Sequence, residues 1–227
     1  MTTTPLESPS GVVFDLDGTL VDNMAQHAEA FRIFAERYGL PPLTTEMRAR
    51  LDGKRNRDIF PILFDRDLSP ELTTKYTHEK ESLYREISRG KLAPMRGLLR
   101  FLDALDRRGV PYGIATSAPP ENVQHSLAAI GLRSRIASVM RSDEVPRGKP
   151  HPDVFLAAAA LIGADPSRCL AFEDAPAGVA SAKNAGMFCV ALSTTFAAVT
   201  LTGHSPPPDL IVADYDVFLA GPGARLL

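Results

Sequence analysis

Tryptophan is absent from the 227-residue chain, and cysteine occurs only twice, as Cys169 and Cys189. Neither cysteine has the CxxC or Cys/His spacing of a zinc site, so we expect two buried free thiols, as is usual in a reducing cytoplasm. The chain also lacks an excess of either charge, because 25 lysines and arginines face 27 acidic residues and the formal net charge is −2. Without a long basic run, a phosphate-neutralising surface for nucleic acid is not expected.

Long apolar stretches are missing as well. No uninterrupted apolar run approaches the roughly 20 residues needed to cross a bilayer. Residues 1–10 are polar, contain two prolines and lack the basic and apolar regions of a secretory signal. We therefore expect a cytoplasmic protein without a membrane partner. The 44% apolar and 23% charged content is ordinary for a globular protein, and the length allows one large domain with a smaller insert.

What is present is a change of pattern along the chain. Residues 23–38 carry apolar residues at steps of three and four, which predicts an amphipathic helix, and Ser69-Pro70 is a typical helix start. The apolar positions of the first of these helices are Ala28, Phe31, Ala35 and Tyr38. No strand-like alternation occurs between residues 23 and 92, so this block is predicted to be all helix.

From residue 98 onwards, predicted strands alternate with helices, which is typical of a parallel sheet. The predicted strands are Val12–Phe14, Val110–Ala115, Ile136–Met140, Cys169–Phe172, Phe188–Leu192 and Leu210–Ala213. The order predicts an α/β fold, with a Rossmann-like parallel sheet core, helices on both of its faces and an inserted all-helical cap. We expect the core to comprise residues 1–22 and 93–227 and the cap residues 23–92.

The most informative segment is Phe-Asp-Leu-Asp-Gly-Thr-Leu-Val-Asp at residues 14–22. Asp15 follows a predicted buried strand, at the end where open α/β sheets place their chemistry. A carboxylate there can attack phosphorus, and Asp17 in the following turn can donate and accept the proton. The alternative interpretation is a strand that ends in an ordinary Asp-Gly turn, because both residues are favoured in turns for backbone reasons.

Further polar residues follow other predicted strands or connecting loops. Thr116 could hold phosphate oxygens, although a helix cap is the simpler interpretation. Lys149 could neutralise a phosphoryl group, although most loop lysines are solvated. Glu173 and Asp174 offer hard oxygen ligands suited to Mg²⁺, although they could also cap a helix. Each signal is weak alone, but parallel strands end at one edge of a sheet, so all these groups can converge.

These motifs resemble those of the haloacid dehalogenase superfamily, in particular the branch that carries a helical cap after the first strand and includes β-phosphoglucomutase and small sugar-phosphate phosphatases. The matching segments are Asp-Leu-Asp-Gly-Thr-Leu-Val-Asp at 15–22, Thr116, Gly-Lys-Pro at 148–150, and Phe-Glu-Asp-Ala-Pro-Ala-Gly at 172–178. The resemblance implies a nucleophilic Asp15, a general acid/base Asp17, and phosphoryl contacts from Thr116 and Lys149. It also implies Mg²⁺ held by Asp15, Asp17 through its backbone carbonyl, and Asp174, with Glu173 in support.

The resemblance leaves the phosphoryl acceptor open. His27 resembles the histidine that positions the acid/base in the mutase and hexose-phosphate phosphatase branch, although it could simply pack on its helix. The run that begins at Ser117 has lost the lysine and asparagine with which β-phosphoglucomutase grips a second phosphate, and Asn56 stands where the family has a cap arginine. Flanking Arg55 or Arg57 could substitute for that arginine, or they could be solvated surface residues.

We therefore expect hydrolysis of a small-molecule phosphomonoester, a sugar or polyol phosphate, by a monomer or weak homo-oligomer. A phosphosugar mutase is the alternative. A catalytically idle phosphosugar-binding regulator is a third possibility, but it would have no need for both Asp15 and Asp17. Dehalogenation needs neither a metal nor a second acidic group. Because this chain has candidate ligands for a metal and a second acidic group, we do not expect a dehalogenase.

Overall fold

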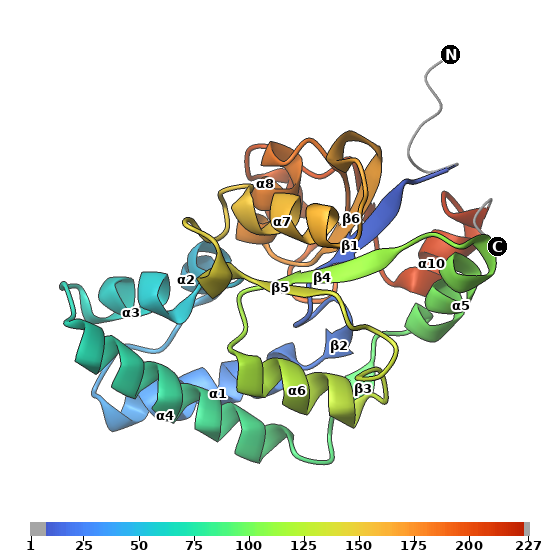
Figure 1. The fold of residues 1–227 in the computed structure, drawn as a ribbon. Helices are drawn as coiled ribbons and strands as arrows, with labels where there is room; N and C mark the ends of the chain where they lie inside the picture. Colours follow the sequence, from blue (N-terminus) through green and yellow to red (C-terminus); the bar gives the residue numbers. More distant parts are fainter. Residues whose placement is uncertain (1–7, 225–227) are drawn as a thin grey trace.

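A six-stranded parallel sheet forms the centre of the molecule (Figure 1). The structure is a computed structural model, and it describes residues 8–224. The strand order is β5-β4-β1-β6-β7-β8. The strands are β1 (Gly11–Phe14), β4 (Tyr112–Thr116), β5 (Val139–Arg141), β6 (Cys169–Glu173), β7 (Phe188–Leu192) and β8 (Leu210–Val212). β1 therefore lies in the middle of the sheet, and Phe14 at its end is level with Ile114 on β4 and Phe172 on β6.

Helices cover both faces of this sheet, as the sequence predicted. Because side chains alternate along a strand, Val12 and Phe14 point to one face of the sheet and Val13 to the other. The first face packs on α5, α6 and α10, and the second packs on α7, α8 and α9. These helices are α5 (Leu98–Arg108), α6 (Pro120–Ala129), α7 (Asp153–Leu161), α8 (Pro176–Asn184), α9 (Ala198–Thr202) and α10 (Tyr215–Ala220), with short 3₁₀ turns at η1 (Ser142–Glu144) and η2 (Pro166–Arg168).

The chain between β2 and β3 forms a separate group of four helices. They are α1 (Met24–Arg37), α2 (Thr45–Leu51), α3 (Asn56–Phe64) and α4 (Pro70–Ser88), and we call them the four-helix segment. Its members share an apolar cluster of their own, to which Phe34, Phe60 and Tyr76 contribute. In Figure 1 this segment lies beside the carboxyl-terminal ends of the central strands rather than over a face of the sheet.

Some local details differ from the sequence predictions. The buried face of α1 comprises His27, Ala30, Phe31, Phe34 and Ala35, whereas Ala28 and Tyr38 are only half-buried. β4 begins at Tyr112 rather than at 110 and β5 at Val139 rather than at 136, while α9 and α10 were not predicted. These short elements have too few residues to establish a period, so the pattern could not locate them.

The two crossings into the four-helix segment are paired with each other, which the sequence did not reveal. β2 (Val21–Asp22) and β3 (Ala93–Pro94) form an antiparallel ribbon with Val21 opposite Pro94. The backbone N–H of Met95 also donates to the carbonyl of Leu20. Cys169 and Cys189 are buried and free, as predicted. Within residues 8–224, none of the helices combines the length and the apolar character that a bilayer crossing requires.

Candidate active site

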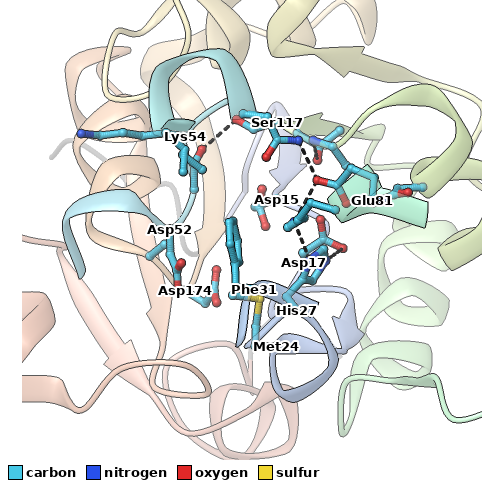
Figure 2. A pocket seen from close by; sticks show the side chains of 18 residues that line it. Asp15, Asp17, Met24, His27, Phe31, Asp52, Lys54, Glu81, Ser117 and Asp174 are labelled. Atoms are coloured by element: carbon cyan, nitrogen blue, oxygen red, sulfur yellow. Dashed lines mark hydrogen bonds and ion pairs between the residues drawn. The ribbon is translucent and has the colours of Figure 1, made fainter. Parts of the chain in front are cut away.

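The carboxyl-terminal edge of the sheet and the four-helix segment enclose a cavity between them. Figure 2 shows Asp15, Asp17 and Asp174 around this cavity, together with Ser117 from the sheet side and Glu81 from α4. Asp15 and Asp17 follow β1, Ser117 follows β4, and Asp174 follows β6. The structure therefore brings together at one edge the polar residues that follow different strands of the sheet.

Asp15 lies against a fully buried cation. The ammonium of Lys149 donates hydrogen bonds of 2.6 Å to Asp15 Oδ1 and of 2.6 Å to Glu173 Oε1. Burial alone lowers the pKa of Lys149, but the two carboxylates reverse this effect and raise its pKa above the ordinary value. Lys149 is therefore charged at neutral pH, and it holds the Asp15 side chain at the end of β1.

Glu173 uses both of its oxygens inside the protein. Oε1 accepts from Lys149, and Oε2 accepts from the backbone N–H groups of Asp174 and Ala175 at 2.9 and 3.0 Å. Gly178 leaves room for this carboxylate, because a Cβ at that position would lie 1.6 Å from Glu173 Oε1. Glu173 thus fixes Lys149 and the start of the β6–α8 turn.

Three buried carboxylates, those of Asp15, Glu173 and Asp174, each have an oxygen within 4.8 Å of the others. If all are ionised they carry −3 against the +1 of Lys149, which leaves −2 in a buried site. Burial raises the pKa of Asp15 to about 7, with Glu173 adding to the rise and Lys149 opposing it. Burial also raises the pKa of Asp174 well above its usual value, and Glu173 and Asp15 contribute.

This donor set fits a hard divalent cation. Mg²⁺ prefers carboxylate and carbonyl oxygens and would relieve the uncompensated charge. Because Glu173 is fully engaged, Asp15 and Asp174 are the better candidates to bind an ion directly. Asp174 is itself oriented by a hydrogen bond from the hydroxyl of Thr195. Gly18, with a φ of 80°, lies so close that a Cβ there would meet Asp174 Oδ2 at 2.0 Å.

Asp17 is held by Asn23, the residue before α1, and by His27 of α1. Asn23 donates a hydrogen bond of 2.6 Å to Asp17 Oδ1, and His27 Nε2 lies 3.5 Å from the same oxygen. Burial raises the pKa of Asp17, but the neighbouring His27 and the hydrogen bond from Asn23 outweigh it and leave the pKa below the ordinary value. The carboxyl group is therefore ionised when no anion is bound beside it.

The tautomer of His27 follows from its neighbours. The ammonium of Lys80 lies 3.3 Å from His27 Nδ1, and an ammonium can only donate. Nδ1 must therefore accept, so a neutral His27 carries its proton on Nε2, the nitrogen that faces Asp17. The ring of Tyr84 stacks on the imidazole with centroids 3.8 Å apart, which fixes the plane of the ring.

Thr116 and Ser117 lie on the sheet side of the same cavity. The hydroxyl of Thr116 accepts from the N–H of Ala118 at 3.0 Å, the local bond of a strand-to-helix turn. The hydroxyl of Ser117 donates to the carbonyl of Gly53 at 2.7 Å. Since Gly53 lies between α2 and α3, Ser117 links the sheet to the four-helix segment.

The structure does not bring Arg55 and Arg57 into this cavity. Arg55 is buried and donates to Asp58 at 2.6 Å, and Arg57 is exposed. Both line a neighbouring outer groove instead. Lys54 and Asn56, from the same stretch of chain, line the cavity, although Figure 2 shows the Lys54 side chain directed away from its centre.

Several site residues were not singled out from the sequence. They are Asn23, Asp52, Lys80, Glu81, Tyr84, Asn122 and Thr195. Asn23 carried one local signal, its place directly before the first apolar helix and directly after the acidic motif. Thr195 follows β7 at the same edge of the sheet. Asp52, Lys80, Glu81 and Tyr84 belong to the four-helix segment, and only the packing of this segment on the sheet brings them to the cavity or to the residues beside it, where Asn122 of α6 meets Glu81.

Comparison with known proteins agrees with this geometry. Residues 12–192 match the family model described as haloacid dehalogenase-like hydrolase. The chain is 30% identical over 196 residues to validoxylamine A 7'-phosphate phosphatase of Streptomyces hygroscopicus subsp. limoneus, covering 83% of this chain and 88% of the relative. It is 33% identical over 190 residues to β-phosphoglucomutase of Bacillus subtilis strain 168, covering 79% and 81% respectively.

A solved structure gives the same assignment. The crystal structure of a haloacid dehalogenase hydrolase of family IA, variant 3, from Entamoeba histolytica HM-1:IMSS superposes with a TM-score of 0.82 at 26% identity. The superposition covers 95% of this chain and 98% of that one. Together with the family model, which spans most of the chain, this likeness identifies the protein as a member of the haloacid dehalogenase-like hydrolase family.

Proposed function

We propose that this protein is a Mg²⁺-dependent phosphatase that hydrolyses a small phosphomonoester, a sugar or polyol phosphate, through an aspartyl-phosphate intermediate. The observation that carries the proposal is the placement of Asp15. Its carboxylate lies at the end of the central strand, 2.6 Å from the Lys149 ammonium and in the same cavity as Asp17. Transfer of a phosphoryl group to a carboxylate requires a nucleophile, a positive charge that offsets the charge of the phosphate, and a group that moves the proton. Asp15, Lys149 and Asp17 would supply these three.

Asp15 and Asp174 are the residues that would hold Mg²⁺ directly, with the backbone carbonyl of Asp17 as a third donor and Glu173 in support. The bound ion would reduce the repulsion between a phosphate dianion and the attacking carboxylate. Lys149 acts in the same sense, because its charge lies beside the attacking oxygen. Thr116 at the end of β4, the strand beside β1, and Ser117 directly after it are suited to hold the phosphoryl oxygens.

The covalent chemistry balances with these residues alone. An oxygen of Asp15 attacks phosphorus, the bond between phosphorus and the ester oxygen breaks, and Asp17 gives its proton to the departing oxygen. In the second half, Asp17 takes a proton from water as that water attacks the phosphorus, and the bond to Asp15 breaks to release inorganic phosphate. The first step needs a protonated Asp17, and the charge of a bound phosphate raises the pKa of a neighbouring carboxyl group.

The substrate class is supported by the relatives and by the cavity. One relative is named for a phosphorylated validoxylamine and another for phosphoglucose, and both names denote small phosphorylated molecules. The cavity has a volume of about 80 Å³. On the same measure a single water molecule needs roughly 10–15 Å³. This space suits a phosphoryl group with a small part of its ester, rather than a macromolecular substrate.

We further propose that the four-helix segment is a cap, with residues 23–92 moving as a unit over a core of residues 1–22 and 93–227. The paired strands β2 and β3 lie at both crossings, so they are the natural hinge. The bond from Ser117 to the Gly53 carbonyl would have to break on opening. Opening would expose the cavity, and closure would exclude water from the phosphoryl transfer.

A phosphosugar mutase is the second candidate. The relative from Bacillus subtilis named as a mutase favours it, and so does the contact between His27 and Asp17. A mutase must hold a sugar bisphosphate in two orientations, which requires a second anion site. Arg55 pairs with Asp58 outside the cavity, so this arginine is poorly placed to supply such a site.

The test is a screen of phosphomonoesters with the wild-type protein, with and without Mg²⁺, next to the Asp15→Asn variant. We expect the wild type to release inorganic phosphate only in the presence of Mg²⁺. The rate of release should fall by at least about a thousandfold in Asp15→Asn. The far-ultraviolet circular dichroism spectrum of the variant should match that of the wild type, which shows that it is folded. Wild-type turnover by Asp15→Asn would exclude the assignment. Conversion of β-glucose 1-phosphate to glucose 6-phosphate without release of phosphate would favour the mutase, and binding without any turnover would favour a regulator.

A further inference from the structure

Arg55 is a buried arginine that the proposed reaction does not use. It lies directly before α3 and is 9% exposed, and no other arginine of residues 8–224 is buried to this extent. Its guanidinium donates to Asp58 twice, at 2.6 Å from Nε and at 3.2 Å from Nη2. A pair with two hydrogen bonds fixes the plane of the guanidinium. Asp58 therefore orients Arg55, but it does not account for the burial of the side chain.

The buried side of Arg55 faces the chain between β5 and α7, which we call the connecting segment (residues 142–149). Nη1 donates to the carbonyl of Ser142 at 3.4 Å. The stem of the side chain lies on Gly148, because a Cβ at that position would lie 3.1 Å from Arg55 Cγ, 2.9 Å from Cδ and 2.6 Å from Nε. In Figure 1 the connecting segment passes beside α2. Arg55 thus reaches from the four-helix segment to the core.

Gly148 is suited to this contact by its size. It is not among the glycines with a positive φ, so an alanine could adopt the same backbone. An alanine would lack the space, and an extra methyl group in a tight contact displaces one of the partners. The next residue is Lys149, whose ammonium donates to Asp15 and Glu173 at 2.6 Å each. Arg55 therefore lies against the residue directly before the proposed phosphoryl-binding lysine.

The chain just before Arg55 contacts the core as well. Gly53 has a φ of 86°, and a Cβ there would lie 3.3 Å from the Cβ of Ala175. The carbonyl of Gly53 accepts from Ser117, whose hydroxyl also lies 3.0 Å from Ser142 Oγ. Residues 53–55 thus contact the chain that follows β4, β5 and β6. Movement of the four-helix segment away from the sheet would break these contacts together.

Other bonds of the connecting segment are local. Arg147 pairs with Asp153 at 2.8 Å, and the carbonyl of Gly148 accepts from the N–H of His151 at 3.0 Å. Such bonds hold at any position of the four-helix segment, whereas the contact of Arg55 with Gly148 requires that this segment lies on the sheet. The connecting segment therefore has one restraint that depends on closure.

We propose that Arg55 is a positioning residue: when the four-helix segment closes, its side chain holds the connecting segment through Gly148 and Ser142 and so keeps Lys149 in place beside Asp15. This inference rests on the proposed phosphatase function and on the proposed movement of the four-helix segment. A displacement of about 1 Å at a catalytic group can cost about 100-fold in rate. The contact would therefore couple closure to phosphoryl transfer.

The experiment is a double-mutant cycle on Arg55 and Gly148, with para-nitrophenyl phosphate as substrate in the presence of Mg²⁺. We expect kcat to fall at least about tenfold in Gly148→Ala, because the added methyl group displaces Arg55 or Lys149. Arg55→Ala removes the contact and should lower kcat by at least about fivefold. KM should change by less than about threefold in both variants, since neither residue lines the cavity.

The decisive measurement is the effect of Gly148→Ala in the Arg55→Ala background. With the long side chain removed, the added methyl group has room. The kcat of the double variant should therefore lie within about twofold of that of Arg55→Ala. If Gly148 mattered only for the backbone next to Lys149, Gly148→Ala would cause the same loss in both backgrounds.

Two control variants lie outside the contact. Arg147→Ala removes an exposed arginine of the same connecting segment, and Gly221→Ala changes an exposed glycine without a positive φ, whose Cβ would meet the Val217 carbonyl at 3.4 Å. Both should keep kcat within about twofold of the wild type. Circular dichroism and thermal denaturation establish which variants are folded. If Gly148→Ala alone does not fold, the added Arg55→Ala should restore folding, and failure to do so would contradict the proposal.

The outcomes separate the positioning role from the phosphatase. If the wild type is active but folded Arg55→Ala keeps the wild-type kcat, or if the losses of the two single variants multiply in the double variant, the role of Arg55 is wrong and the phosphatase stands. If the wild type hydrolyses neither para-nitrophenyl phosphate nor any other phosphomonoester, the phosphatase itself is wrong, and the inference falls with it.

Discussion

Asn23 ties the proposed acid/base to the four-helix segment. Its side-chain N–H₂ donates to Asp17 Oδ1 at 2.6 Å and to the hydroxyl of Tyr84 at 2.7 Å, and its Oδ1 accepts from the N–H of Gly18 at 3.0 Å. Tyr84 in turn lies 3.1 Å from Ser126 on α6. The fully buried amide of Asn23 therefore links the loop after β1 to α4. The contact of Tyr84 with Ser126 continues this link to α6, which packs on the sheet.

This position predicts a joint loss of activity and stability in Asn23→Ala. Without the amide, Asp17 is free to leave its orientation and the N–H of Gly18 loses its acceptor, so kcat should fall at least about tenfold and the free energy of unfolding by about 1–3 kcal/mol. Steady-state kinetics and urea unfolding measure the two quantities. Asn184→Ala, which removes a bond to the Pro150 carbonyl on the surface, is the matched control. Wild-type kcat in Asn23→Ala would show that Asp17 does not depend on this contact.

Lys149 is predicted to matter for folding as well as for phosphoryl transfer. Lys149→Met keeps the length of the side chain but leaves Asp15 and Glu173 as buried carboxylates without their shared cation. The free energy of unfolding without metal should fall by about 3–5 kcal/mol, the usual effect of breaking a buried pair.

Urea unfolding in EDTA measures this loss. Lys183→Met breaks the surface pair with Asp209 and should cost about 1 kcal/mol or less, so it serves as the control. A Lys149→Met protein as stable as the control would contradict the idea that two buried carboxylates depend on one ammonium.

Mg²⁺ is predicted to stabilise the protein, and Thr195 to tune that effect. A ligand that binds the folded state raises the unfolding temperature with its concentration, so Mg²⁺ should raise Tm and EDTA should reverse the rise. Thr195→Val removes the hydroxyl that orients Asp174 and should weaken Mg²⁺ binding by about tenfold, the lower range for such supporting contacts.

The measurement is Tm against Mg²⁺ concentration for the wild type, Thr195→Val and Thr202→Val, whose hydroxyl bonds only to its own helix. The curve of Thr195→Val should be displaced to higher concentration, and that of Thr202→Val should not. A Tm that is independent of Mg²⁺ in the wild type would remove the ion from the proposed mechanism.

The sequence was sufficient to predict those site residues whose position is determined by the ends of the strands. Asp15 and Asp174 follow strands of one parallel sheet and Thr116 is the last residue of another strand, so their convergence is a consequence of topology, which the alternation of strands and helices already predicts. Their catalytic roles stay predictions. The assignment to the family rests on the same ordered motifs and is confirmed by the family model.

The spacing of apolar residues in the sequence could not predict the contacts of the four-helix segment. From the sequence, Glu81 and Tyr84 are ordinary positions of a helix, and only the packing of α4 on α1 and α6 turns Glu81 toward the cavity and Tyr84 toward Asn23. Arg55 illustrates the reverse error, since its place in the sequence suggested the cavity while its pair with Asp58 turns it into the outer groove. A shift of one residue at the start of a helix rotates a side chain by about 100°, which sequence alone does not resolve.

The contact between α4 and α6 also predicts a pH dependence of stability. His125 on α6 bonds to the hydroxyl of Ser88 at 2.8 Å, and its ring lies edge-on to Tyr84. Burial lowers the pKa of His125, and the neighbouring Arg85 and Arg89 lower it further from its ordinary value of 6.5.

Because the folded-state pKa is lower than the unfolded-state pKa, the unfolded chain binds more protons once the pH falls toward and below 6.5. His125 therefore lowers the free energy of unfolding on acidification, and its contribution is absent well above pH 7. In His125→Gln the loss of stability between pH 7 and pH 5 should be smaller than in the wild type, whereas at pH 8 the two should differ only by the altered contact with Ser88. Urea unfolding across this range tests the sign, with His204→Gln, an exposed histidine outside this interface, as the control. Parallel curves for His125→Gln and the wild type would show that protonation of this imidazole is not coupled to unfolding.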